Sequence, residues 1–254
     1  MSNLLVSHEG KVAVLELNQP PANFFNHELL TEIHDAIVEV SSDDRCRAVL
    51  LCSAGKHFCA GANLSEGGLG EELVDWARTL YATAVTLFDL ELPIVAAVQG
   101  TAVGGGLGLA CVADLRVASP STRFHANFAG LGFHQGFGLS VTLPRIIGEQ
   151  AATDMLLTAR RVTGEEAHRL GLADRLVEDG RVREEGLALA EQIAAQAPIA
   201  VRSMRKTLRG DLADRVRAAL RHELAEQAQH WSTADCEAGI AANLRRETPE
   251  FHGR

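Results

Sequence analysis

Long apolar runs and paired cysteines are both missing from this chain of 254 residues. No segment approaches the roughly 18 uninterrupted apolar residues of a membrane-spanning helix, and the first residues lack the apolar stretch of a signal peptide. The five cysteines form no CxxC pair and no His/Cys spacing typical of zinc sites. We therefore expect a cytoplasmic protein with reduced, mostly buried thiols, no bound metal and no membrane partner.

The signatures of several common enzyme classes are also absent. The glycines that follow Thr101 fail the dinucleotide-binding pattern GxGxxG in both registers, because the sixth residue is Leu109 or Cys111. The chain has no Gly-Lys-Ser/Thr of a phosphate-binding loop, no GxSxG and no HExxH. Its net charge of −9 disfavours nucleic acid as a partner.

What the chain does contain is a glycine-rich stretch from Pro93 to Asp114, PIVAAVQGTAVGGGLGLACVAD. The apolar run before Gly100 predicts a buried strand, and the triple glycine at 104–106 predicts a tight turn and the start of a buried helix. Backbone N–H groups at a helix start have no partner inside the helix, and glycine lets another molecule approach them. The stretch is suited to bind an anion, or an oxygen that becomes one, although glycines that only permit close packing give the same pattern.

Strand patterns that alternate with helix patterns in the first half predict an α/β core. We expect a hairpin within residues 4–17, helices at about 29–40 and 71–90, and short strands at 47–53, 94–98 and 115–118. From Glu149 onward the composition predicts a largely helical region. We divide the chain into a core, residues 1–195, and a helical C-terminal region, residues 196–254.

Several co-linear motifs resemble the enoyl-CoA hydratase/isomerase (crotonase) superfamily. They are GKHFCAGANL at 55–64, the stretch from 93 to 106, the glycine-rich loop at 131–138, TGEEA with GLADRLV at 163–177, and the segment around PEF at 249–251. The resemblance covers nearly the whole chain. It implies an α/β fold built as a spiral of ββα turns with C-terminal helices, and assembly into homotrimers or hexamers through those helices.

The resemblance also implies a site. In this family two backbone amides form an oxyanion hole for the thioester carbonyl of an acyl-CoA, and the matching positions here are Ala62 and Gly105. The residues that match the substrate-binding wall are Ala60, Gly61, Asn63, Leu64, Gly104 and Phe128. Coenzyme A would be part of the substrate, so no separate cofactor is expected.

The acidic residues used by the family are missing. The two hydratase glutamates match Gly108 and Phe128, and the relocated carboxylate of some isomerases matches Gly136. Acid–base chemistry needs a positioned proton donor or acceptor, and we predict that His134, two residues before Gly136, supplies it. A loop histidine that binds backbone explains His134 equally well.

Other candidates have simpler explanations. We expect His125 and His57 to point away from the site, Tyr81 to pack with its polar tip bonded locally, and Asp114 to be structural. Solvent exposure is the default for Lys56, Glu66, Glu71 and Glu72.

Three functions stay open. The first is an acyl-CoA-processing enzyme that hydrates or isomerises a double bond through a thioester enolate. The second is a CoA-thioester or ring-opening hydrolase, and the third is an acyl-CoA-binding protein without catalysis. An ionisable side chain close to the Gly105 amide would favour the two enzymes over the binding protein.

Overall fold

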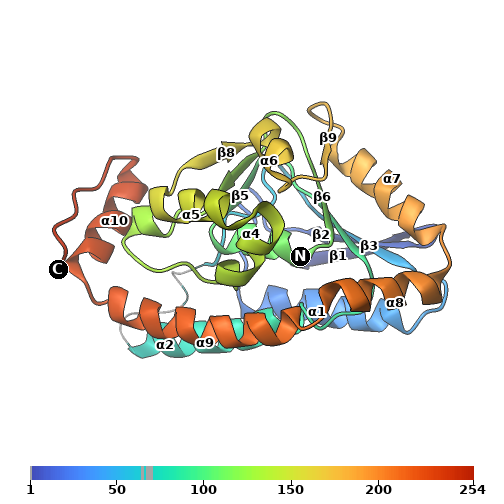
Figure 1. Cartoon of the computed structure of the whole chain (residues 1–254), viewed down its shortest axis with the longest axis horizontal. Helices are drawn as coiled ribbons and strands as arrows, with labels where there is room; N and C mark the ends of the chain where they lie inside the picture. The colour runs from blue at the N-terminus through green and yellow to red at the C-terminus, as the bar shows by residue number, and fades with distance from the viewer. Residues whose placement is uncertain (1, 64–65, 67–70) are drawn as a thin grey trace.

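The computed structural model describes residues 2–63, 66 and 71–254 (Figure 1). Its main sheet has the strand order β1-β2-β3-β4-β6-β9. The predicted hairpin is confirmed: β1 (Leu4–Glu9) pairs antiparallel with β2 (Val12–Leu17). The sheet continues in parallel through β3 (Ala48–Ser53), β4 (Ile94–Ala97), β6 (Leu115–Ala118) and β9 (Arg175–Leu176).

A second, smaller sheet has the order β5-β7-β8. Its strands are β5 (Thr101–Val103), β7 (Arg123–His125) and β8 (Arg161–Thr163). Because β5 directly precedes the triple glycine, this small sheet fixes where the following helix begins.

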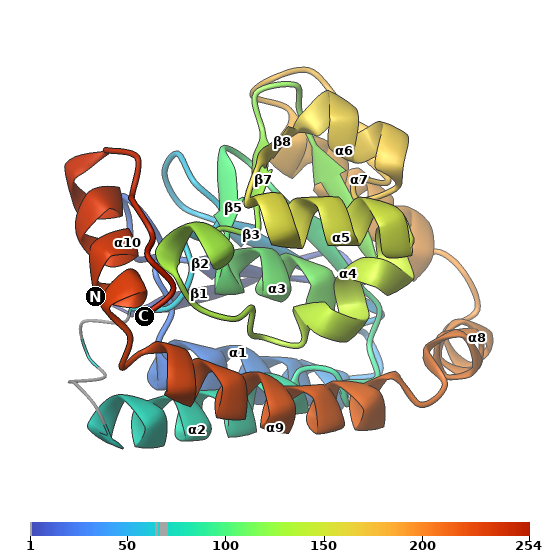
Figure 2. The ribbon, with the colours of Figure 1, turned by 60° about the vertical axis from the view of Figure 1, so that its left-hand side comes forward.

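Helices cover the sheets (Figure 2). The first half contains α1 (His27–Ser41), α2 (Glu71–Thr86), α3 (Gly105–Val112), the 3-10 turn η2 (Ala129–Leu131), α4 (Leu139–Ile147) and α5 (Glu149–Thr158). The second half contains α6 (Gly164–Leu170), α7 (Val182–Ala194), α8 (Pro198–Arg209), α9 (Leu212–His230) and α10 (Ala234–Arg245). Helix α7 covers one face of the main sheet, whereas α3 is buried in the larger core on the other side.

Three details differ from the sequence-based prediction. Helix α2 ends at Thr86 and not at Leu90, the strand β5 interrupts the predicted turn before the triple glycine, and β8 and β9 lie in the region expected to be largely helical. These strands have only two or three residues, so they carry no periodic pattern of their own. Pairing with neighbouring strands creates them.

The C-terminal helices fold back over the core. Helix α9 packs against α2 and α4, and α10 packs against η2 (Figure 2). The proposed boundary at residue 195 falls between α7 and α8, and the independence of the two parts stays a prediction. All five cysteines are buried and unpaired, as expected. Within residues 2–63, 66 and 71–254, no helix has the length and apolar character needed to cross a bilayer.

Candidate active site

Ala62 and Gly105 line the same cavity, which has a volume of about 80 Å³ and is called the amide cavity below. The turn that carries Ala62 is fixed by backbone hydrogen bonds: Phe25 N–H donates to the Gly61 carbonyl at 2.9 Å, and Asn63 N–H donates to the Phe25 carbonyl at 2.8 Å. A Cβ atom on Gly61 would lie only 3.7 Å from the Gly105 amide nitrogen. The turn and the start of α3 therefore lie close together, as the family resemblance implied.

The amides of Ala62 and Gly105 have no hydrogen-bond acceptor among the described residues. Gly104 N–H is occupied, because it donates to the His125 carbonyl at 2.8 Å, and the Gly104 carbonyl accepts the first bonds of the helix from Leu107 and Gly108. Gly105 thus presents a free donor at the positive end of α3. Two free N–H groups at one cavity can bind a carbonyl oxygen and stabilise negative charge on it.

Aromatic side chains form much of the remaining wall. Phe128 packs edge-on against Phe133 with ring centroids 5.8 Å apart, and Phe133 packs against Trp231 at 6.2 Å. The sequence analysis did not identify the wall residues Trp76, Ala77, Leu80, Asn127, Leu131, Gln227 and Trp231. The residues from α2 and α9 join the site only through helix packing, which leaves no local motif.

A sequence model of the enoyl-CoA hydratase/isomerase family matches residues 7–254. The chain belongs to this family. Its membership confirms the resemblance drawn from the motifs, and the solved relatives described next confirm the crotonase-type fold.

Relatives match over the full length. The short-chain-enoyl-CoA hydratase of Clostridium acetobutylicum is 32% identical over 256 residues, covering 98% of this chain and 97% of the relative. The 2,3-dehydroadipyl-CoA hydratase of Escherichia coli is 31% identical over 259 residues, covering 100% of both chains. A crystal structure of an enoyl-CoA hydratase/isomerase from Pseudoalteromonas atlantica gives a TM-score of 0.86 at 32% identity, covering 99% of this chain and 100% of that one.

Two of the three positions expected to carry family glutamates, Gly108 and Gly136, are closed to longer side chains. A Cβ atom on Gly108 would lie 2.6 Å from the Phe137 side chain, and one on Gly136 would lie 2.0 Å from the Tyr81 hydroxyl. Phe128 itself is 7% exposed and lines the cavity. A carboxylate at Gly108 or Gly136 would require the neighbouring aromatic residue to move.

The Tyr81 hydroxyl and the Gln227 amide occupy the space beside Gly136. Tyr81 O–H donates to Gln227 Oε1 at 2.9 Å, and Gln227 Nε2 donates to the His134 carbonyl at 2.9 Å. Burial, together with the nearby Glu223, raises the pKa of the Tyr81 phenol, so this side chain stays neutral at physiological pH. Tyr81 can bind a polar atom in the cavity, but it cannot act as a phenolate base there.

A side chain of helix α9 also fixes the end of the glycine-rich loop. The fully buried Glu223 accepts Gly138 N–H at 2.8 Å and Ser140 N–H at 3.0 Å. Directly before Gly138 in the chain lies Phe137, which adopts a left-handed φ of 59° and packs edge-on against Phe25, with ring centroids 5.2 Å apart. The loop that backs the Gly105 amide is therefore fixed by side chains from a distant helix.

His134 is not one of the residues that line the amide cavity. Its Nδ1 atom lies 2.8 Å from the Gln135 carbonyl, and its ring stacks on His230 with centroids 6.4 Å apart. If Nδ1 carries the proton for that contact, Nε2 is left as a possible acceptor. The acid–base role of His134 stays a prediction that this position does not support.

The remaining predicted residues divide between the cavity and its surroundings. Ala60, Gly61, Gly104 and Phe128 line the cavity with Ala62 and Gly105. Asn63 follows them in the chain and donates from Nδ2 to Glu66 Oε1 at 2.7 Å, whereas Leu64 lies outside the described residues.

The two other candidate histidines, His125 and His57, do not line the amide cavity. His125 Nε2 is 2.7 Å from the Ala159 carbonyl, and His57 Nδ1 is 3.1 Å from the Thr101 hydroxyl. Burial lowers the pKa of both imidazoles, which favours their neutral forms. Among the residues that the structure describes, no group of three His, Cys, Asp or Glu side chains could hold a metal ion.

Proposed function

We propose that this family member processes an acyl-CoA thioester by stabilising a thioester enolate between the Ala62 and Gly105 amides. The observation that carries this proposal is the pair of free N–H groups at one cavity. When a thioester loses an α-proton or accepts a nucleophile at Cβ, its oxygen gains negative charge. One oxyanion donor contributes about 2.7–4 kcal/mol of transition-state stabilisation. Hydration or double-bond isomerisation of an enoyl-CoA are the reactions we favour.

The proposed substrate contacts follow the same geometry. Ala60, Gly61 and Gly104 would place backbone close to the thioester, and Phe128 would cover the acyl group. Asn63 and Leu64, which follow Ala62 in the chain, would contact the coenzyme A arm. The acyl-CoA supplies the only coenzyme in this proposal, and we place the enzyme in the cytoplasm.

A second candidate, an acyl-CoA-binding protein without turnover, is favoured by one observation. Among the described residues that line the amide cavity, none carries a carboxylate or an imidazole. Without a general acid or base, an oxyanion hole can bind and polarise a thioester but cannot complete a proton transfer.

Incubation with a panel of enoyl-CoA esters, followed by mass spectrometry of the products, tests the proposal. Mass gain of one water indicates hydration, an unchanged mass with altered retention indicates isomerisation, and free coenzyme A indicates hydrolysis. Binding without any product would establish the second candidate and overturn the first.

The same assay with His134→Ala tests the predicted acid–base residue. If His134 transfers a proton, turnover falls at least 10²-fold, as is typical of a general acid or base. His125→Ala is the matched control, because its imidazole binds the Ala159 carbonyl away from the cavity. Turnover that survives His134→Ala would remove His134 from the mechanism.

We also propose that the protein forms a homotrimer or hexamer through its C-terminal helices. Helix α8 supports this, because Ile199, Met204 and Leu208 are 86%, 63% and 74% exposed. Large apolar side chains grouped on one exposed helix indicate a protein interface. Light scattering coupled to gel filtration gives the mass directly, and a monomer at micromolar concentration would contradict the proposal.

A further inference from the structure

Three histidines, called the histidine cluster below, join the glycine-rich loop at 131–138 to α9. The His134 ring stacks on the His230 ring with centroids 6.4 Å apart, and it lies edge-on to the His222 ring at 5.8 Å. His134 and His230 are half-buried, whereas His222 is exposed. In the part of the chain that the structure describes, these side chains do not form a group that could hold a metal ion.

Two side chains of α9 hold the main chain of His134. Its N–H donates to His230 Nδ1 at 3.2 Å, and its carbonyl accepts Gln227 Nε2 at 2.9 Å. A neutral imidazole has one acceptor nitrogen and one donor nitrogen. Because the partner of His230 Nδ1 is an N–H group, His230 must be neutral in this contact, with its proton on Nε2. Of the two bonds, only the one to His230 depends on the protonation of a side chain.

The residues next to this contact form part of the wall of the amide cavity. Phe133 directly precedes His134, Trp231 directly follows His230, and both aromatic side chains line the cavity. Their ring centroids lie 6.2 Å apart. The bond between His134 and His230 therefore connects the two segments of chain that bring Phe133 and Trp231 together.

Protonation of His230 would break this connection. A histidinium donates from both ring nitrogens, so Nδ1 could no longer accept the His134 N–H, and two donors would face each other. A charged His134 ring, stacked on a charged His230 ring, would add repulsion between like charges. Histidine side chains gain their charge as the pH falls from about 8 to about 5, so both changes would follow mild acidification.

Several acids lie on the helices around the histidine cluster, but none of those described pairs with it. On α9, Glu226 lies one turn before His230, and the positive charge of His134 acts on the buried Glu223. Among the ion pairs of the described residues, none joins an acid to a histidine of the cluster. The charged groups on the adjoining ends of α2 and α10 are the Asp75–Arg78 pair, Asp235, which accepts two N–H groups of the C-terminal segment, and the exposed Glu71, Glu72 and Glu237.

We propose that the histidine cluster is a pH-sensitive switch for the amide cavity, with His230 as its titrating residue. Above about pH 7, neutral His230 accepts the His134 N–H and keeps Phe133 against Trp231. At lower pH, protonated His230 releases the loop, and this part of the cavity wall opens. The proposal rests on the proposed function only for its consequence, which is that acyl-CoA binding weakens as the pH falls.

Trp231 reports on the contact without any ligand. The chain has two tryptophans, so Trp76→Phe leaves Trp231 as the single fluorescent indole. In this parent variant we expect acrylamide to quench Trp231 more strongly at about pH 5.5 than at about pH 8. Adding His230→Asn should abolish the difference, because the asparagine Oδ1 replaces Nδ1 as the acceptor and does not titrate. Equal differences with and without His230→Asn, or no difference in the parent, would overturn the proposal.

His230→Leu is the opposite variant, since leucine offers no acceptor at any pH. Trp231 should then be quenched at about pH 8 as strongly as in the acidified parent, and a pH response like that of the parent would contradict the switch. His222→Asn is the matched control, because His222 contacts the His134 ring rather than its N–H, and the response should persist. Loss of the response in His222→Asn would show that charge within the cluster, and not the His230 bond, is its cause.

Isothermal titration with butyryl-CoA, which has no double bond to hydrate, tests the consequence for ligand binding. We expect binding at least about tenfold weaker at pH 5.5 than at pH 8 in the unsubstituted protein, and no such difference in His230→Asn. Titration of the ligand itself affects both proteins equally, so equal weakening in the two would reject the switch. If butyryl-CoA binds at neither pH, the proposed function fails, while the ligand-free quenching of Trp231 still decides whether the switch exists.

Discussion

The two ends of helix α3 differ in their hydrogen bonding. At its N-terminal end, Gly105 lines the amide cavity, and its N–H has no acceptor among the described residues. At its C-terminal end, the Val112 carbonyl accepts Arg209 Nη1 at 3.2 Å and the Ala113 carbonyl accepts Arg116 Nη1 at 2.8 Å. The N–H group at the positive end of the helix is therefore available to a ligand, whereas arginine side chains bond the carbonyl groups at the negative end.

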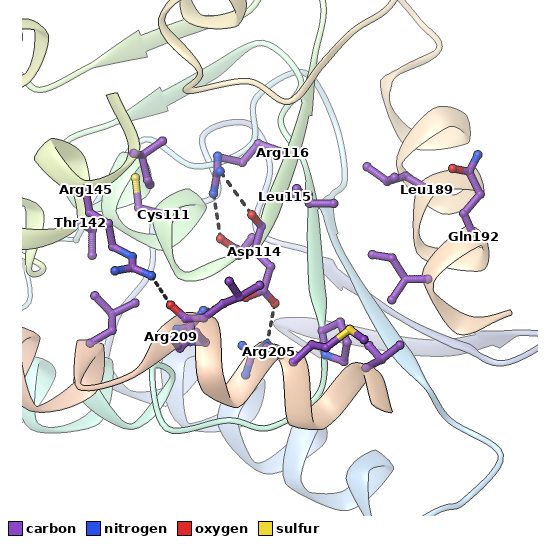
Figure 3. Close-up of a pocket in the computed structure, with 18 of the residues that line it drawn as sticks. Cys111, Asp114, Leu115, Arg116, Thr142, Arg145, Leu189, Gln192, Arg205 and Arg209 are labelled. Atoms are coloured by element: carbon purple, nitrogen blue, oxygen red, sulfur yellow. Dashed lines mark hydrogen bonds and ion pairs between the residues drawn. The ribbon is translucent and has the colours of Figure 1, made fainter. Parts of the chain in front are cut away.

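This difference separates function from stability. A free amide contributes little to the fold, but it can respond when a bound oxygen gains charge. The occupied end binds α8 to the core through Asp114, whose carboxylate pairs with Arg205 and Arg209 (Figure 3). Its Oδ2 also accepts the Ile94 N–H of β4 at 2.9 Å. We expect substitutions at the first end to impair catalysis and substitutions at the second end to impair folding.

The largest expected effect is on stability. Asp114→Ala removes the one carboxylate between Arg205 and Arg209, and breaking such a buried pair costs about 3–5 kcal/mol because it leaves charge uncompensated. Urea unfolding followed by circular dichroism measures the loss. Asp214→Ala is the matched control: its carboxylate is 83% exposed and pairs with Arg217, so the change should stay within about 1 kcal/mol. Equal losses in the two variants would contradict the structural role of Asp114.

The next effect is on turnover. Gly105→Pro deletes the free N–H, and the first position of a helix tolerates proline, so the fold should persist. Turnover should fall by about 10²–10³-fold, the usual loss for one oxyanion donor.

The structure adds a complication that the sequence did not reveal. Any Cβ atom at position 105 would lie 2.6 Å from the ring of Phe25. Gly105→Ala is therefore the necessary control, since it introduces the same contact but keeps the N–H. If alanine and proline reduce turnover equally, the steric contact explains the loss and Gly105 is not the donor.

The sequence was sufficient to predict which backbone segments line the amide cavity. The triple glycine and the GKHFCAGANL turn have local signatures, because a free amide at a tight turn requires particular small residues. The short distance between the Gly61 turn and Gly105 then follows from the packing of the two segments. The hairpin, the buried β4 and the helix α3 were also predictable, because turn residues bound their apolar runs.

The side chains that complete the wall of the amide cavity could not be predicted in this way. Tyr81 and Gln227 are 146 residues apart, and only the packing of α9 on α2 brings them together. Likewise, glycine at 136 suggested a missing carboxylate, but nothing local shows that the Tyr81 hydroxyl fills that space. Contacts made by helix packing depend on the whole chain, so their residues carry no short motif.

The smallest expected effect comes from a comparison of the carboxylates of Asp114 and Glu223. Asp114 has two cationic partners, whereas Glu223 forms no ion pair within the described part of the chain, and burial raises its pKa. A carboxyl group whose pKa is raised on folding binds its proton more tightly in the native state. Its contribution to stability is therefore full below the unfolded value of about 4.5 and declines as the pH rises through the native value.

Glu223→Gln removes this titration, so the stability of the unsubstituted protein relative to the variant should fall as the pH rises above about 4.5. Urea unfolding at several pH values measures the difference, and Glu191→Gln, on the exposed side of α7, supplies the reference. The variant also loses one of the two backbone contacts to Gly138 and Ser140, since its amide nitrogen cannot accept a hydrogen bond. That loss does not depend on pH. The test is therefore the slope of the stability difference plotted against pH. A difference that stays constant across the range would show that Glu223 titrates alike in both states, and that a buried acid beside the amide cavity is compensated as fully as Asp114 is at the other end of α3.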